Sequence, residues 1–389
     1  MKNQATRRSF LAAGLSFPAA SLTAAALGNS APLVRSSQVS SAPQLNYRVL
    51  GKTGMKVTTV GFGCMITSDP TVIERAADAG INYFDTARGY QRGNNERMVG
   101  AALKSRRKEI HLSSKAKTRT REGALAELDT SLKELGTDYL DVWYLHAMGS
   151  PSELSDEMCA ALDQAKQQGK TRFAGVSLHS GHQELLPALT ASPHIDVILT
   201  SYNFTMDPAV APLLQKASDA GKGIVAMKVM AGGLRRLKPG DAMYDKLNTA
   251  GTMLAALKWA IREPIVHTSI PSITDVDQLQ ENLKAMEIPF GSTDEKLLAA
   301  QLDYLRPLYC RMCGQCSGVC PKGLPVSDML RYLTYAEGYG QFELGRENYL
   351  SMPEDLQQVR CGDCKTCPID CPNGVQVVQR LSRAQELFA

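Results

Sequence analysis

At 389 residues the chain is long enough for one large domain and one small one, because single hydrophobic cores stop growing at about 250–300 residues. Hydrophobic residues make up 44% and charged residues 21%, which is ordinary for a soluble globular protein. The formal net charge is only +4, with lysine and arginine scattered along the chain, so the composition argues against nucleic-acid binding.

The first 31 residues predict an export signal and its leader. Arg7 and Arg8 are followed by Phe-Leu and then by an uncharged, alanine-rich run with small residues at its end. This layout resembles a twin-arginine signal, which implies export of the folded protein and a periplasmic location. The alternative is an arginine-rich segment without a targeting function. No stable membrane anchor is expected, because Gly14 and Pro18 interrupt a run of moderate hydropathy.

Short apolar segments alternate with amphipathic ones over residues 45–290, the pattern of repeated β-α units. The predicted strands are Thr59–Gly63, Ile81–Asp85, Ile110–Ser114, Tyr139–Leu145, Arg172–Ser177, Asp196–Thr200, Ile224–Met227 and Val266–Ile270. The helical patterns between them include Glu122–Leu135, Met158–Gln168 and Asp275–Ala285. Eight such units predict an α/β fold, a (β/α)8 TIM barrel over residues 44–300, preceded by a hairpin at Tyr47–Gly54. A doubly wound open sheet is the alternative, weakened because no G-x-G-x-x-G follows the first strand.

Four polar side chains stand at or just beyond the ends of predicted strands, where barrels of this kind have their chemistry. Asp85 ends the second strand and Tyr90 lies five residues beyond it. Lys115 ends the third strand and His146 ends the fourth. Each residue alone has an ordinary explanation as a capping, packing or surface group. Their occurrence together at one face predicts an active site.

These residues resemble the catalytic tetrad of the aldo-keto reductases. The matching motifs are Asp85-Thr86-Ala87-x-x-Tyr90, Asn95-Glu96, Leu50-Gly51-x-Thr53-Gly54, Gly175-Val176-Ser177, Tyr202-Asn203, Ile270-Pro271 and Glu281-Asn282. The resemblance implies hydride transfer between a nicotinamide cofactor and a small carbonyl or alcohol substrate. It assigns Tyr90 as the acid/base, Lys115 and Asp85 as the groups that tune it, and His146 as the orienter of the substrate oxygen. Since a phenol is a poor base at neutral pH, the ammonium is expected to lower the pKa of Tyr90.

The cofactor site implied by the resemblance departs from the family pattern. Ser177 is kept, but Leu178 and Leu199 stand where family members commonly have Asn and Gln. Tyr202 is expected to stack on the nicotinamide, and His179 is either a substitute hydrogen-bonding partner or a surface residue. The other expected contacts are Lys228 and Arg235 near the pyrophosphate, and Glu281 and Asn282 further along the chain.

The adenosine end favours NAD(H) over NADP(H). Family members that prefer NADP usually present a lysine and an arginine that clamp the 2′-phosphate. The aligned positions here are Ser272 and Gln278, flanked by Asp275 and Asp277. Neutral and acidic side chains do not attract a phosphate.

Eight of the ten cysteines lie after residue 309, in two strings of identical spacing. The pattern C-x2-C-x2-C-x3-C-P occurs at Cys310, Cys313, Cys316 and Cys320, and again at Cys361, Cys364, Cys367 and Cys371. It resembles the spacing in bacterial ferredoxins with two [4Fe-4S] clusters, in which the fourth cysteine of each string reaches the other cluster. The implied sets are Cys310, Cys313, Cys316 with Cys371, and Cys361, Cys364, Cys367 with Cys320. Zinc and disulfides are the alternatives, and both explain the spacing less well.

Residues 301–389 are therefore predicted to form a small, helix-rich, dicluster ferredoxin-like domain, with a helical pattern around Val326–Ala336. This tail is also a candidate to cover the catalytic mouth of the barrel. Cys64 and Cys159 lie outside the strings and are expected to be buried structural thiols.

The sequence thus predicts an exported, nicotinamide-dependent oxidoreductase. The alternative is an electron-transfer or nicotinamide-sensing module whose main redox partner is the clusters rather than a carbonyl substrate. A binding protein without chemistry agrees less well with a complete tetrad. We find no flavin motif that could split a hydride into single electrons. The clusters are therefore either structural or connected to an external electron donor or acceptor. Because the periplasm is not expected to hold free NAD, the nucleotide is expected to travel bound.

Overall fold

The computed structural model describes residues 44–232, 251–316 and 318–389. Residues 42–389 form one compact unit. The predicted export signal and the predicted pyrophosphate contact Arg235 lie outside the described residues. Among the helices that the structure describes, none has both the length and the apolar character needed to cross a bilayer.

Eight parallel strands follow one another around a barrel in chain order. They are β3 (Phe62–Gly63), β4 (Tyr83–Asp85), β5 (His111–Ala116), β6 (Leu140–Met148), β7 (Thr171–Leu178), β8 (Val197–Ser201), β9 (Gly223–Met227) and β10 (Thr268–Ser269). Parallel bridges join the first and last strands, from Val60 to Ser269 and from Gly63 to Ser272. The predicted (β/α)8 barrel is confirmed. The alternative, an open sheet, is excluded because these bridges join the two edges of the observed sheet.

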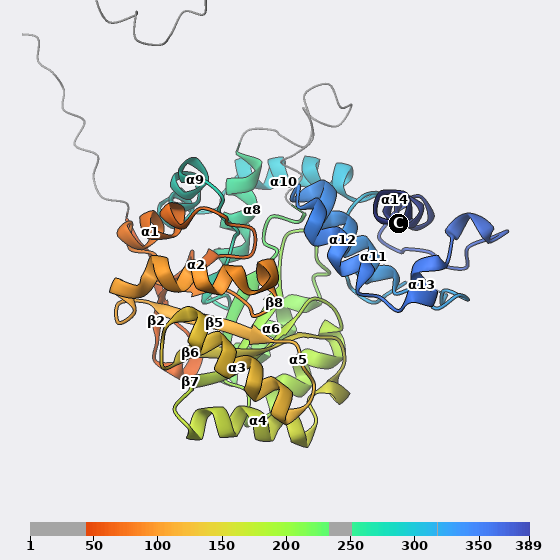
Figure 1. The fold of residues 1–389 in the computed structure, drawn as a ribbon. Coiled ribbons are helices and arrows are strands. Elements are labelled where there is room, and N and C mark those ends of the chain that lie inside the picture. The colour runs from red at the N-terminus through yellow and green to blue at the C-terminus, as the bar shows by residue number, and fades with distance from the viewer. Residues whose placement is uncertain (1–43, 233–250, 317) are drawn as a thin grey trace, which may run out of the picture. The chain divides into compact units, whose positions relative to one another are not determined.

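Helices surround the strands (Figure 1). They are α1 (Pro70–Asp78), α2 (Asn94–Leu103), α3 (Arg121–Leu135), α4 (Asp156–Gln167), α5 (His182–Ala191), α6 (Val210–Asp219), α8 (Thr252–Ile261), α9 (Val276–Glu287) and α10 (Ser292–Leu305). The ends of α3 show how the sequence sets their bounds. Thr120 caps its start by accepting a hydrogen bond from the Gly123 amide, and Gly136 ends it with a φ of 64°, which glycine adopts without a Cβ clash.

The predicted hairpin is present and closes the N-terminal end of the barrel. Strand β1 (Tyr47–Val49) pairs antiparallel with β2 (Lys56–Thr58). Between them, Leu50 is fully buried in the interior cluster with Val142 and Val197. The end of the barrel opposite to the catalytic face is therefore filled by packed side chains.

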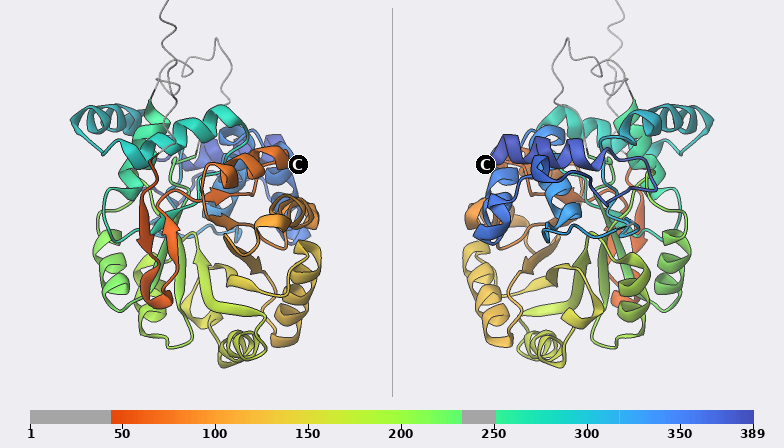
Figure 2. Two further views of the ribbon diagram at one scale, coloured as in Figure 1. Left: turned by 90° about the vertical axis from the view of Figure 1, so that its left-hand side faces the viewer. Right: turned by 90° about the vertical axis from the view of Figure 1, so that its right-hand side faces the viewer.

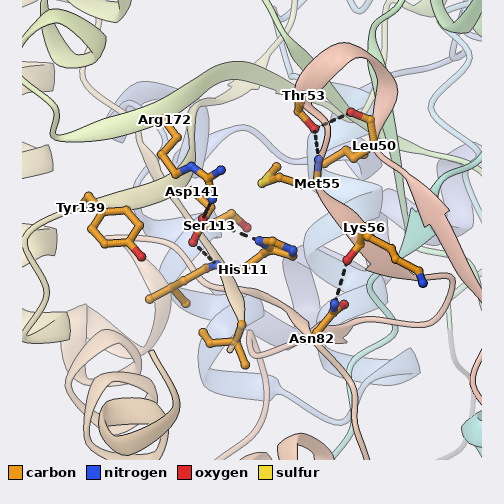
Figure 3. Close-up of polar contacts among 12 residues, drawn as sticks. Leu50, Thr53, Met55, Lys56, Asn82, His111, Ser113, Tyr139, Asp141 and Arg172 are labelled. Carbon is orange, nitrogen blue, oxygen red and sulfur yellow. Dashed lines mark hydrogen bonds and ion pairs between the residues drawn. The ribbon is translucent and has the colours of Figure 1, made fainter. Parts of the chain in front are cut away.

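A buried carboxylate, Asp141, lies at this same end, at the start of β6 (Figure 3). It accepts a hydrogen bond from the Leu112 amide at 2.9 Å and pairs with Arg107 at 2.9 Å and Arg172 at 2.8 Å. His111 Nδ1 lies 3.6 Å away. Because this network is remote from the C-terminal strand ends, its role is structural.

The tail consists of helices with a core of their own. They are α11 (Val326–Leu333), the π-helical turn η5 (Thr334–Gly338), α12 (Phe342–Leu350), α13 (Glu354–Gln358) and α14 (Val377–Phe388). Met329, Leu333, Tyr349, Leu381 and Phe388 are buried together between them. The helix predicted around residues 326–336 is confirmed, and its last turn widens into η5.

The tail packs on the catalytic face of the barrel (Figure 2). The residues that follow β8 make three of these contacts: Asn203 donates to the Tyr309 hydroxyl at 3.4 Å, Arg311 donates to the Thr205 carbonyl at 2.9 Å, and Gln315 donates to Asp207 at 2.8 Å. Arg92, beyond β4, pairs with Glu347 of α12. The tail therefore lies over the ends of the strands that hold the tetrad.

Candidate active site

The four predicted catalytic residues meet in one place. The Lys115 ammonium lies 2.5 Å from Asp85 Oδ2, 2.7 Å from the Thr86 carbonyl and 3.4 Å from the Tyr90 hydroxyl. The rings of Tyr90 and His146 are 5.9 Å apart, edge to face at 82°. Asp85, Tyr90 and His146 line a pocket of about 440 Å³, and Lys115 is buried directly behind it.

Buried polar contacts hold the loop between Asp85 and Tyr90. Ser113 donates to Asp85 Oδ1 at 2.7 Å, opposite the lysine. Thr86 donates to Asn95 at 2.6 Å, and Asn95 in turn donates to the Cys64 carbonyl at 2.8 Å. The Asn95-Glu96 motif therefore fixes the position of the catalytic loop from outside the pocket.

Burial determines the protonation of Tyr90. It raises the pKa of Tyr90 well above the ordinary value, and the nearby Asp85 carboxylate and Tyr335 hydroxyl raise it further. The net pKa of Tyr90 is therefore raised rather than lowered, because burial and the Asp85 charge outweigh the Lys115 ammonium 3.4 Å away. Tyr90 is a protonated phenol at neutral pH and is suited to donate a proton.

His146 is held in its neutral form. Burial is the largest cause that lowers the pKa of His146 well below its usual value, and the charge of Lys115 lowers it further. Its Nδ1 atom is buried without a hydrogen-bonding partner among the described residues. A neutral imidazole beside a protonated phenol can donate a hydrogen bond that orients a carbonyl oxygen, while the phenol keeps the proton that it will transfer.

Two predicted nicotinamide contacts do not reach the pocket. The Ser177 hydroxyl accepts a hydrogen bond from the Ala147 amide at 2.7 Å and so supports the backbone next to His146. The Tyr202 ring is 3% exposed and packs on Trp259, with centroids 5.0 Å apart. The stacking position predicted for Tyr202 is not present. Met227, at the end of β9, lines the pocket, as does the predicted contact Lys228.

The pocket continues to the start of α9, where the adenosine end was predicted. Ser272 and Gln278 line it. Asp275 caps α9 through the Gln278 amide at 2.8 Å and also holds the Gln278 side chain. Further along α9, next to Glu281, both polar atoms of the Asn282 amide are buried without partners among the described residues. A volume of about 440 Å³ is within the usual range for small-molecule and cofactor sites, and Asn282 itself does not line the pocket.

The pKa of one thiol in each string is raised by thiols of both strings. Burial and the neighbouring thiols of Cys316, Cys313 and Cys371 raise the pKa of Cys310 to about 12. Burial and the thiols of Cys320, Cys367 and Cys364 raise the pKa of Cys361 to about 11. These neighbours are the ones that the ferredoxin-like spacing implies for each of the two groups.

The surroundings of the first group include a hollow and two hydrogen-bond donors. The hollow has a volume of about 290 Å³ and is lined by Cys310, Cys313, Cys316 and Cys371, and also by Cys320 of the second group. The Met312 amide donates to Cys310 Sγ at 3.4 Å, and Asn373 donates to Cys313 Sγ at 3.3 Å. Within the described ranges, no three ligand-type side chains are close enough to bind a single metal ion. Outside the strings, Cys64 is fully buried as predicted, whereas Cys159 is only half-buried.

The sequence did not identify the tail residues that line the pocket. Arg331 lies on α11, Tyr335 on η5 and Tyr339 directly after η5, and the Lys228 ammonium lies 4.6 and 5.1 Å from the centroids of the Tyr335 and Tyr339 rings. A spacing of four residues puts all three on one face of a helix, which is the signal that could have shown them. The sequence did not indicate which residues of the barrel this helix face would contact.

A closed (β/α)8 barrel with a Tyr-Lys-Asp-His constellation at its C-terminal face defines an oxidoreductase of the carbonyl-reducing class. The sequence pattern of the Aldo/keto reductase family matches residues 68–301, which is more than half of the chain. The chain therefore belongs to the aldo/keto reductase family. The match ends before the cysteine strings.

Known proteins agree with this assignment. The chain is 26% identical over 310 residues to L-galactose dehydrogenase of Arabidopsis thaliana, which covers 68% of this chain and 96% of the relative. It is 27% identical over 308 residues to the oxidoreductase YqkF of Bacillus subtilis, with 68% and 98% covered. Among solved structures, the aldo-keto reductase AKR11C1 of Bacillus halodurans (holo form) is similar at 26% identity and a TM-score of 0.58, over 66% of this chain and 96% of that one.

Proposed function

We propose that this protein transfers a hydride between NAD(H) and a small carbonyl or alcohol substrate at the tetrad. One observation supports this above all: Tyr90, Lys115, Asp85 and His146 meet in a single pocket, with the tyrosine hydroxyl 3.4 Å from the ammonium. A bound nicotinamide supplies or accepts the hydride. The protein residues supply the proton and the orientation.

Each residue has a distinct task in reduction. The neutral His146 imidazole holds the carbonyl oxygen next to the Tyr90 hydroxyl, which gives its proton to the oxygen as negative charge develops there. Lys115 then stabilises the phenolate that remains, and Asp85 keeps the ammonium charged and in place. In oxidation the same phenolate takes the proton from the alcohol.

The preference for NAD(H) is also a proposal. At the adenosine end the Gln278 side chain is engaged with Thr274 and Asp275, so the pocket is lined by neutral groups there and the Asp275 carboxylate lies next to them. A 2′-phosphate would be repelled by the carboxylate and would lack a cationic partner at these positions. Fluorescence titration with NADH and NADPH tests this, and tighter binding of NADPH would overturn it.

We further propose that the two cysteine groups hold two [4Fe-4S] clusters. The spacing C-x2-C-x2-C-x3-C-P, which occurs twice, is the one that holds such clusters in bacterial ferredoxins. Amide donors to sulfur and the hollow among the thiols support the same proposal. Iron content well below about eight per chain in anaerobically prepared protein would contradict it.

A second candidate function is electron transfer or nicotinamide sensing, with an external electron donor or acceptor. The observation that favours it is the proximity of the first cysteine string to the barrel. Tyr309, next to Cys310, accepts a hydrogen bond from Asn203, which lies beside the pocket. In this case NADH would reduce the clusters in a Tyr90→Phe variant as fast as in the wild type, and no carbonyl compound would be turned over.

The test of the main proposal uses Tyr90→Phe in the full-length protein, with Tyr139→Phe as a matched control. Tyr139 lies at the opposite end of the barrel, against Arg107, and its replacement keeps the ring. We expect Tyr90→Phe to lose about 10²–10⁴-fold of carbonyl reduction, as expected for general acid catalysis, and Tyr139→Phe to lose none. Full activity of Tyr90→Phe would overturn the assignment.

Export by the twin-arginine route, with the nucleotide bound throughout, remains our proposal for the cellular setting. Replacing Arg7 and Arg8 by lysine is expected to keep the protein in the cytoplasm. Heat denaturation of the purified protein is expected to release nicotinamide nucleotide, and finding none would contradict the bound-cofactor hypothesis.

A further inference from the structure

Two cations from distant parts of the chain meet in the pocket above the tetrad. Lys228 follows β9 of the barrel, and Arg331 lies on α11 of the tail. Arg331 Nη1 donates to the Tyr335 hydroxyl at 3.2 Å, and the Lys228 ammonium lies 4.6 Å from the centroid of the Tyr335 ring. Tyr335 therefore contacts both cations.

The pocket supplies little negative charge to balance this pair. Arg331 shares one side of its guanidinium with Asp328 at 2.7 Å, but its Nε is buried without a hydrogen-bonding partner in the described part of the chain. Burial lowers the pKa of Lys228, and the group that chiefly opposes this effect is the phenol of Tyr335, not a carboxylate. Cations held in this way favour an anionic ligand, because burial without a counter-charge is costly.

The two lining carboxylates do not change this balance. Asp85 is paired with Lys115 inside the tetrad, and Glu347 is paired with Arg92 at the rim. The part of the pocket around Lys228 is therefore left positive, which raises the local concentration of small anions.

The contacts of Tyr335 with the two cations favour negative charge on its oxygen. Although burial alone would raise it, Lys228 and Arg331 lower the pKa of Tyr335 to about 8. The oxygen position that these cations share is thus favourable for a carboxylate or phosphate oxygen.

The cation pair also lies within electrostatic reach of the reacting groups. The charge of Arg331 acts on the tetrad, where it lowers the pKa of His146 and offsets part of the rise for Tyr90. An anion bound between Lys228 and Arg331 would therefore be close to a carbonyl held by Tyr90 and His146.

We infer that Lys228 and Arg331 form an oxyanion subsite, completed by the tail, that binds a carboxylate or phosphate group of the substrate. This rests on the proposed function, because it names the substrate class of the same site: small carbonyl compounds or alcohols with an anionic group near the reacting carbon. Tyr335 is the positioning residue that holds the two cations together before the substrate binds.

The test measures binding without turnover. Full-length protein, prepared anaerobically with its iron, is titrated calorimetrically with oxalate, which contains two carboxylates and no reducible ketone. We expect Arg331→Gln and Lys228→Gln to weaken oxalate binding about tenfold or more, since each removes one charge-assisted hydrogen bond. Arg331→Lys is expected to recover part of the loss, and Arg346→Gln, an exposed site on α12, to have no effect.

Further measurements separate the alternatives. NADH titrations of the same variants distinguish the substrate anion from the nucleotide pyrophosphate. If Arg331→Gln weakens NADH and leaves oxalate unchanged, the substrate assignment is overturned. Tyr335→Phe keeps the ring and both cations but removes the hydroxyl that accepts from Arg331, so oxalate binding should weaken less than in Arg331→Gln, and no change at all would contradict the positioning role. Equal oxalate binding in all variants would overturn the subsite. An inactive tetrad would leave oxalate binding intact, so the two proposals fail separately.

Discussion

Replacing Lys115 by methionine is the sharpest perturbation of the catalytic network. The ammonium and the Asp85 carboxylate are 1% and 2% exposed and 2.5 Å apart. Removing the lysine leaves Asp85 buried, with Ser113 as its remaining hydrogen-bonding partner. Breaking a buried pair in this way costs about 3–5 kcal/mol of the free energy of unfolding.

The loss should depend on pH in a direction that identifies its cause. Burial raises the pKa of Asp85, and Lys115 is the largest influence that lowers it. Without the lysine, the folded pKa of this carboxyl rises further above its unfolded value of about 3.9. The folded state then binds more protons, so the variant should lose stability as pH rises from about 3.9 through that folded pKa.

Urea unfolding between pH 5 and pH 8 measures both effects, with Lys104→Met, an exposed lysine, as the control. Adding Asp85→Asn to Lys115→Met should recover stability, because no charge is then left buried. The reasoning would be refuted if Lys115→Met cost less than about 1 kcal/mol, or if the second substitution deepened the loss.

Three other outcomes follow from the same contacts. Burial opposes ionisation of Asp141, but His111, Arg107 and Arg172 outweigh it and hold the pKa of this carboxyl below its usual value. Asp141 therefore stabilises the fold above about pH 3.9, and this contribution is lost as pH falls through the folded pKa. Asp141→Asn should cost about 3 kcal/mol of the free energy of unfolding at neutral pH, and urea unfolding at a series of acidic pH values should show a weaker pH dependence than in the wild type. Gln278→Arg should raise the affinity for NADPH relative to NADH about tenfold in fluorescence titrations, and an unchanged ratio would contradict the proposed adenosine site. Cys371→Ser should lower the iron content and the cluster absorbance, while Cys159→Ser changes neither. Equal iron content in the two variants would contradict the assignment of Cys371 to the group around Cys310.

The sequence determined the barrel and the position of its tetrad. Strand periodicity fixes which residues end each strand, and parallel strands of a barrel bring those ends to one face. Asp85, Lys115 and His146 could therefore be read from the chain before any contact was known. The cysteine spacing likewise predicts that the first three thiols of each string lie together, because short loops join them, whereas the fourth comes from the other string and depends on how the tail packs.

Only the tertiary structure decided what else reaches the pocket. Tyr202 follows a strand as expected, yet it packs on Trp259 of α8, a contact that no local pattern specifies. Arg331 and Tyr335 share a helix face, but only docking of the tail brings that face to Lys228. The same enclosure reversed the expected direction of the Tyr90 pKa. Local periodicity determines where a side chain points, whereas burial and long-range packing determine what it meets and which charge it can hold.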